Sequence, residues 1–433
     1  MKNKRRDFLK LTGIAGIGIA GNMFKGFAVP TENHLNSNLL VSSINPVDEK
    51  DLSIIGLYGP WATALNDNKL PAFSFRRKEW SKLEAWRRAA KRRLIERLAI
   101  PDIGGTPNPN VIKQYIYDGL YIEELSWQLP YGRPTEAILL KPLNAKGRLP
   151  AILAFHDHGG RKSFGIRKIT RTSDYQHPII EGHQKHLYDG LAWANEIAKR
   201  GYVVLVSDAF PFGSRRVMMQ DVPEQMREGL NDIDPENSGN IDRYDDWARA
   251  HEHIMARSLF SAGTTWPAIS FAEDQKALDV LCARADVDAN RIGCGGLSLG
   301  GMRTVFMGGL DPRIKCAVCV GFMTTWKDLV LSKLHTWATY VPLLPNELNF
   351  PEILGLRAPL PALVLNDEDD DLYTPPEMKE AQKILTEVYK KAGAENNFKC
   401  SYYPGPHKFD KKMQGEAFDW FDKWLNSAAP KGS

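Results

Sequence analysis

The sequence has little cysteine and little excess charge of either sign. Its 433 residues include only five cysteines, and this small, odd number excludes a fold held together by a disulfide framework. All five lie in segments typical of a buried core: Cys282, Cys294, Cys316, Cys319 and Cys400. The spacing of Cys316 and Cys319 suits redox or metal chemistry, but residues three apart on a strand face opposite ways. The formal net charge of +4 gives no general case for a nucleic-acid partner.

The hydrophobic stretch near the start is too short for a membrane anchor. It runs from Leu11 to Phe24 without a charge, below the roughly 18 to 20 residues that a spanning helix needs. Basic residues precede it, and among them Arg5 and Arg6 resemble the twin-arginine export signal. That route carries folded proteins across the bacterial inner membrane. We therefore expect a signal peptide at 1–28, the twin-arginine export machinery as a partner, and a periplasmic or secreted protein.

Residues 29–110 are expected to form a polar leader and one amphipathic helix packed on the body. Apolar residues recur at helical spacing from Arg76 to Ile100, and Pro101 ends the run. Many basic residues lie on this helix. Because glutamates interrupt them, we interpret them as a solvated face rather than as a membrane or nucleic-acid surface.

From residue 111 to 433, strand-like and helix-like segments alternate. With 43% hydrophobic residues the chain can bury a large core. The alternation predicts an α/β fold, with a mainly parallel central sheet and helices on both faces. The expected strands are 111–117, 120–127, 135–141, 150–155, 202–207, 314–320, 361–366 and 398–403, and the expected helices include 187–200, 272–285, 303–310 and 411–425.

Gly296-Leu297-Ser298-Leu299-Gly300 has the Gly-x-Ser-x-Gly spacing of a nucleophile elbow. Such a sharp strand-to-helix turn needs neighbours without side chains, since a Cβ two residues from the serine would collide with adjoining backbone. The turn exposes the hydroxyl of Ser298. The amide of Leu299, at the start of the next helix, can donate to an oxyanion.

These segments resemble the alpha/beta-hydrolase superfamily, and within it the dienelactone-hydrolase-like esterases, including the acetyl xylan esterases. The resemblance extends over residues 76–427 and is carried by the helix around Trp86 and by 155–160, 206–213 and 287–292. It implies that Ser298 is the nucleophile. It also implies that Gly159 and Gly160, in the loop after the strand at 150–155, complete an oxyanion hole with Leu299.

A triad on this fold takes its acid and then its base from later in the chain. The resemblance selects Asp370 as the acid, because it precedes a Leu-x-x-Pro-like segment. Asp369 and Asp371 remain alternatives, since Asp367 replaces the usual glycine and leaves the register open. His407 follows the last expected strand, and no histidine other than His407 follows the acidic run, so it is the expected base.

A stretch at about 210–266 is too long for a simple connection between a strand and a helix. Long insertions in compact domains are commonly functional, and we interpret this one as a lid or pocket wall. Trp247 and Trp266 would suit the face of a sugar. Together with His158 they are the candidate substrate-binding residues.

Three histidine pairs raise the question of a zinc site: His156 and His158, His183 and His186, and His251 and His253. None has a spacing that resembles a known zinc site. The expected chemistry is acyl transfer from Ser298 to water, which requires no metal or organic cofactor.

The sequence therefore predicts an exported serine carboxylesterase that acts on a small-molecule or carbohydrate ester with a short acyl group. A peptidase of the prolyl oligopeptidase type is an alternative, but 29–110 cannot hold its propeller domain. The second alternative is a catalytically inactive carbohydrate-binding protein on a hydrolase scaffold. Candidates for all three triad roles argue against it.

Overall fold

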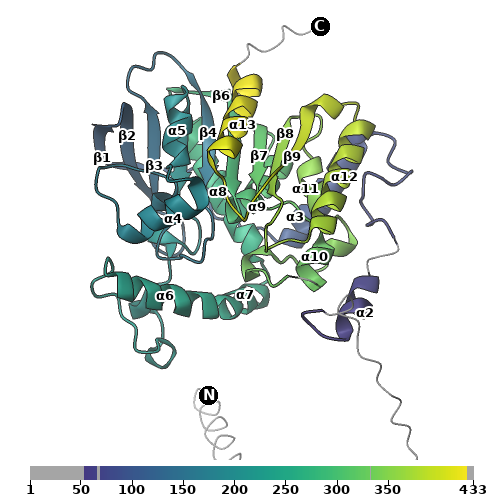
Figure 1. The fold of residues 1–433 in the computed structure, drawn as a ribbon, viewed down its shortest axis with the longest axis horizontal. Coiled ribbons are helices and arrows are strands. Elements are labelled where there is room, and N and C mark those ends of the chain that lie inside the picture. The colour runs from purple at the N-terminus through teal and green to yellow at the C-terminus, as the bar shows by residue number, and fades with distance from the viewer. Residues whose placement is uncertain (1–52, 66–68, 332, 427–433) are drawn as a thin grey trace, which may run out of the picture. The chain divides into compact units, whose positions relative to one another are not determined.

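A nine-stranded sheet lies at the centre of the computed structural model (Figure 1). The structure describes residues 53–65, 69–331 and 333–426. The expected signal peptide at 1–28 lies outside these residues, as does the first part of the leader. Within the described chain, each helix is too short or too polar to cross a membrane.

The strand order in the sheet is β1-β2-β3-β5-β4-β6-β7-β8-β9. The pairs β1–β2, β2–β3 and β3–β5 are antiparallel, and the other five pairs are parallel. This confirms the expected α/β class. The strands are β1 Asn110–Tyr117, β2 Leu120–Trp127, β3 Thr135–Pro142, β4 Leu149–Phe155, β5 Val203–Ser207, β6 Val287–Leu297, β7 Ile314–Val320, β8 Ala362–Asp367 and β9 Phe398–Tyr403.

Helices cover both faces of the sheet (Figure 1). One buried cluster joins the strands to α3, α8, α9, α11 and α12, and a second cluster joins them to α4, α5 and α13. The helices are α2 Tyr58–Ala64, α3 Leu83–Leu98, α4 Pro178–Tyr188, α5 Trp193–Lys199, α6 Ser238–Ala250, α7 Glu252–Ser261, α8 Trp266–Cys282, α9 Leu299–Leu310, α10 Trp326–Leu331, α11 Phe350–Gly355, α12 Pro375–Lys391 and α13 Lys411–Phe421.

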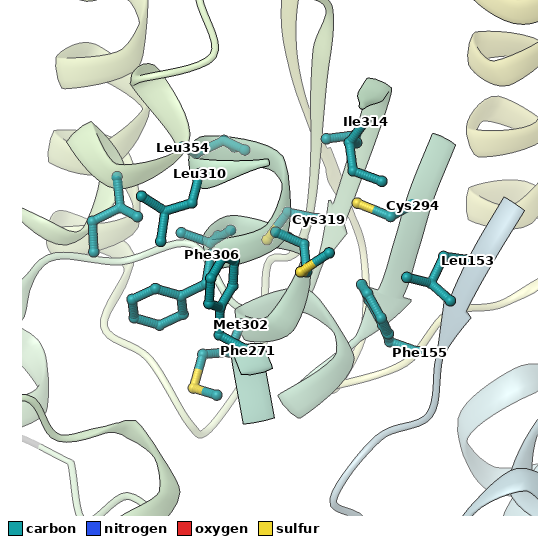
Figure 2. Packing of buried hydrophobic residues seen from close by; sticks show 14 of the residues in the cluster. Leu153, Phe155, Phe271, Cys294, Met302, Phe306, Leu310, Ile314, Cys319 and Leu354 are labelled. Carbon is teal, nitrogen blue, oxygen red and sulfur yellow. The ribbon is translucent and has the colours of Figure 1, made fainter. Parts of the chain in front are cut away.

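The central strands are buried on both faces, so their side chains alternate between the two clusters. On β7, Cys316 belongs to the cluster with α13, whereas Cys319 belongs to the cluster with α9. The two thiols therefore lie on opposite faces of the sheet, as their spacing predicts. Figure 2 shows the α9 side of the core, in which Phe155 of β4, Cys319 of β7 and Met302 of α9 belong to one cluster.

Several helices differ from their expected bounds; α9 begins at Leu299 rather than at 303, and α13 ends at Phe421 rather than at 425. The helix expected from Arg76 begins only at Leu83, after an extended Lys82. The helix expected at 187–200 is two helices, because the chain turns through a left-handed Asp189 with φ of 57°. The helix expected from 272 begins earlier, where the side chain of Thr265 accepts a hydrogen bond from the amide of Ala268.

Candidate active site

Ser298 occupies the turn between β6 and α9. Its φ of 59° and ψ of −122° lie outside the regions that side-chain-bearing residues ordinarily adopt, as a nucleophile elbow requires. The flanking glycines permit a close approach of β4. A Cβ at Gly296 would lie 2.3 Å from the carbonyl oxygen of Phe155, and one at Gly300 would lie 2.5 Å from the same atom. Both positions therefore exclude a side chain.

His407 is held by a carboxylate. Its Nδ1 lies 2.7 Å from Oδ2 of the buried Asp370, whose other oxygen accepts a hydrogen bond from the amide of Leu372. Since a carboxylate accepts, Nδ1 carries the proton and Nε2 is left as an acceptor. That Nε2 is buried and has no hydrogen-bond partner among the described residues. Of the three carboxylates left open by the sequence, Asp369 instead accepts from the amide of Gly405.

One cavity of about 600 Å³ receives Ser298 and His407 together. Its wall is polar on the side of the loop after β4 and of α4, α6 and α7. It is more apolar on the side of the segments that follow β7 and β8. The lining residues are His158, Gly159, Gly160, His183, His186, Leu187, Arg249, Glu252, Ser298, Leu299, Phe322, Leu334, His335, Thr336, Trp337, Leu372, Tyr373 and His407.

A buried lysine fixes the orientation of two peptide groups in the loop after β4. Nζ of Lys168 donates to the carbonyl oxygens of Asp157 and His158, at 2.9 and 2.8 Å. Because C=O and N–H point in opposite directions across a trans peptide, the amides of His158 and Gly159 are directed away from Lys168. Neither amide has an acceptor among the described residues, nor does that of Leu299. Burial lowers the pKa of Lys168 to about 8.

The loop departs from the expected oxyanion hole at one position. The amide of Gly160 donates to Nδ1 of His158 at 3.1 Å, so it is not free for an oxyanion. The amides available from this loop are those of His158 and Gly159. The sequence pattern of adjacent glycines does not reveal which amides the lysine leaves free.

Glu252, the first residue of α7, ties the loop to the opposite wall. Its Oε1 accepts from Nε2 of His158 at 2.7 Å and from Nζ of Lys162, while its Oε2 accepts from Oγ1 of Thr336 and from the amide of Trp337, at 2.7 and 3.1 Å. Burial alone would raise the pKa of Glu252, but the hydrogen bonds from His158 and Lys162 and the charge of Lys162 hold it well below its usual range.

The two tryptophans expected to face a sugar lie elsewhere. Trp247 is buried in a small cluster of the insertion, where its indole N–H donates to the carbonyl of Met226 at 2.9 Å. Trp266 is 1% exposed and packs in the main core at the start of α8. Both rings are packed in buried clusters and neither lines the cavity. Both expectations were therefore wrong. The tryptophan that lines it is Trp337, which no pattern in the sequence singles out.

The histidine pairs do not gather as metal ligands in the described chain. Both ring nitrogens of His156 are engaged, one toward the carbonyl of Asp157 and the other by the amide of Ala209, which follows β5. Nε2 of His183 lies 3.1 Å from the carboxylate of Asp157. Each of these rings is thus engaged by its own neighbours.

The strand order, the helices on both faces and the serine turn after β6 define the alpha/beta-hydrolase fold. No protein-family model matches the chain. It is 27% identical over 309 residues to "Putative hydrolase YtaP" of Bacillus subtilis, covering 70% of this chain and 88% of that protein. A putative acetyl xylan esterase from Bacteroides fragilis superposes with a TM-score of 0.58 at 20% identity, over 79% of this chain and 81% of that one. A glucuronoyl esterase from Solibacter usitatus superposes with a TM-score of 0.54 at 14% identity, over 82% of this chain and 97% of that one.

Proposed function

We propose that the protein is a serine carboxylesterase with Ser298 as nucleophile, His407 as base and Asp370 as the acid that orients the base. The observation that carries this proposal is the hydrogen bond of 2.7 Å between His407 and Asp370, which leaves Nε2 as an acceptor in the cavity that Ser298 lines. A histidine so oriented, in a cavity that a serine also lines, is what acyl transfer needs.

Each step moves one proton through His407. Nε2 takes the proton of Ser298 as Oγ attacks the ester carbonyl, and the oxyanion is held by the amides of Leu299 and of the loop after β4. Collapse of this intermediate breaks the bond to the alcohol, which leaves with the proton from His407. A water then loses its proton to His407, attacks the acyl group and releases the acid, and Ser298 recovers its proton.

The proposed substrate is a short-acyl ester, such as an acetylated carbohydrate. Two observations support a carbohydrate ester. The solved structures with this fold include esterases named for xylan and for glucuronoyl groups. The cavity also has the volume of a typical small-molecule site, and polar groups able to bind hydroxyls lie on one side of a surface that is otherwise mostly apolar.

Export by the twin-arginine route to the periplasm or beyond, with a signal peptide at 1–28, is part of the same proposal. It rests on the sequence around Arg5 and Arg6. We also retain the division into a leader with its helix at 29–110 and a hydrolase domain at 111–433.

The alternatives receive less support. In residues 53–65 and 69–109 the described secondary structure is helix and turn, without the strands of a propeller. An inactive scaffold would not need His407 paired to a buried carboxylate.

The test is a panel of p-nitrophenyl esters of increasing chain length, with acetylated xylo-oligosaccharides, on the wild type, Ser298→Ala and the exposed control Ser258→Ala. We expect turnover of short acyl chains only, its loss in Ser298→Ala and its retention in the control. Labelling by a fluorophosphonate should follow the same pattern. Unchanged turnover in Ser298→Ala would exclude the mechanism, and preference for long chains would exclude the short-acyl substrate.

A further inference from the structure

A second buried carboxylate lies beside the proposed triad. Asp367, the last residue of β8, is 0% exposed. Its Oδ2 accepts from the amide of Lys408 at 3.0 Å, but its Oδ1 is buried without a hydrogen-bond partner among the described residues. An unpaired buried carboxylate oxygen destabilises a fold, so its presence calls for an explanation.

Asp367 is close enough to act on His407. Side-chain oxygens of Asp367 and Asp370 and a ring nitrogen of His407 all lie within 4.8 Å of one another. The amide that Asp367 accepts belongs to Lys408, the residue directly after the histidine. Asp367 therefore already holds the backbone that carries the imidazole, and its free oxygen lies in the same cluster.

We propose that Asp367 is a second acidic residue that positions His407. When Asp370 cannot accept the hydrogen bond from Nδ1 of His407, Asp367 accepts it. This inference rests on the proposed function, since it concerns the same base. Asp370 is the primary partner, because its Oδ2 lies 2.7 Å from Nδ1. Removal of Asp370 frees Nδ1 and leaves Asp367 as the nearest carboxylate in the cluster.

The charges around Asp367 agree with a reserve role. Burial first, and then the negative charge of Asp370, raise the pKa of Asp367, while the Lys408 amide and the charges of His407 and Lys408 lower it, and together they set it at about 7. Two carboxylates this close favour one shared charge. Once Asp370 is removed, the like charge is gone and Asp367 ionises more readily.

The experiment compares Asp370→Ala, Asp367→Asn and the double variant with the wild type, at a pH above 7 where Asp367 is largely ionised. Loss of the only acid of a triad lowers kcat by about 10⁴-fold. We expect Asp370→Ala to lose only about 10- to 100-fold, and the double variant to fall to the 10⁴-fold level, with KM unchanged in both. The exposed Asp419→Asn is the matched control and should retain wild-type kcat.

The result that would overturn the inference is an Asp370→Ala variant already as slow as the double variant. A spectroscopic measurement keeps the test valid if the double variant fails to fold. In folded Asp370→Ala, the proton on Nδ1 of His407 should still give a low-field NMR signal, and its absence would contradict the inference. If Ser298→Ala retains turnover, the proposed function itself fails. If Ser298→Ala is inactive but Asp370→Ala and the double variant have the same kcat, the proposed function stands and only the role of Asp367 is wrong.

Discussion

Glu252 and His158 are joined by a hydrogen bond of 2.7 Å between Oε1 and Nε2, although 94 positions separate them in the chain. With its other oxygen the same carboxylate accepts from Thr336 and Trp337. One buried charge thus connects the insertion, the loop with the proposed oxyanion donors, and the far wall of the cavity. In this structure the start of α7 is a fixed part of the site.

Replacing Glu252 should slow the chemical step. In Glu252→Gln the charge is lost and one of the two acceptor oxygens becomes an NH2 donor, so the loop that presents the oxyanion amides is held less firmly. Loss of one oxyanion donor costs about 10²- to 10³-fold in kcat, and we expect a smaller fall of about 10- to 100-fold here, with little change in KM. Steady-state kinetics with p-nitrophenyl acetate measure it. Glu224→Gln, an exposed residue of the same insertion, should behave as wild type; equal kcat for both variants would show that the loop does not depend on Glu252.

A methyl group at Gly300 should destabilise the elbow. Its Cβ would meet the backbone carbonyl of Phe155 at 2.5 Å, so β4 or α9 must shift. We expect Gly300→Ala to lower the free energy of unfolding by about 1–3 kcal/mol and to lower kcat. Gly415→Ala on α13, where a Cβ meets nothing within 4 Å, should instead raise stability by about 0.5–1 kcal/mol. Urea unfolding of both variants measures the contrast, and equal effects would contradict it.

The helix after the serine depends on a buried ion pair. Arg303 of α9 donates to both oxygens of Asp274 on α8, at 2.5 and 3.0 Å, and its guanidinium lies 4.4 Å from the centre of the Phe155 ring. Asp274→Ala leaves a buried cation without a partner, so we expect a loss of about 3–5 kcal/mol in unfolding free energy. The exposed pair of Arg249 and Asp246 is the comparison. Asp246→Ala should cost at most about 1 kcal/mol, and a similar loss in both variants would contradict the prediction.

Asp367 should make stability fall as pH rises toward neutrality. Burial raises its pKa from the ordinary 3.8 to about 7, so between these values the folded state binds a proton that the unfolded state does not. Its contribution to the free energy of unfolding is complete below about pH 4. This contribution, on the order of a few kcal/mol, is lost as pH rises through about 7. Asp367→Asn should therefore show a flatter dependence of unfolding free energy on pH from 4 to 7. Parallel curves for wild type and variant would disprove this account.

The sequence predicts the sheet and the elbow well, because both follow from local patterns. Apolar runs set the strands, and the two glycines beside Ser298 are needed for contacts within a single turn. The roles of Lys168 and Glu252 in holding the loop after β4 could not be predicted from the sequence. Each is an ordinary charged residue whose importance depends on which distant segments the fold brings to it. The same limit explains Trp247 and Trp266, since composition does not distinguish a ring that packs from a ring that faces a cavity.

The placement of Cys316 and Cys319 on opposite faces of β7 bears on the proposed route out of the cell. The strand itself separates the two sulfur atoms, and they can meet only after it leaves the sheet. A chain that crosses the inner membrane already folded arrives in an oxidising compartment with these thiols beyond each other's reach. A chain that crosses the membrane unfolded would arrive with these two thiols able to form a disulfide. That disulfide would prevent β7 from joining the sheet.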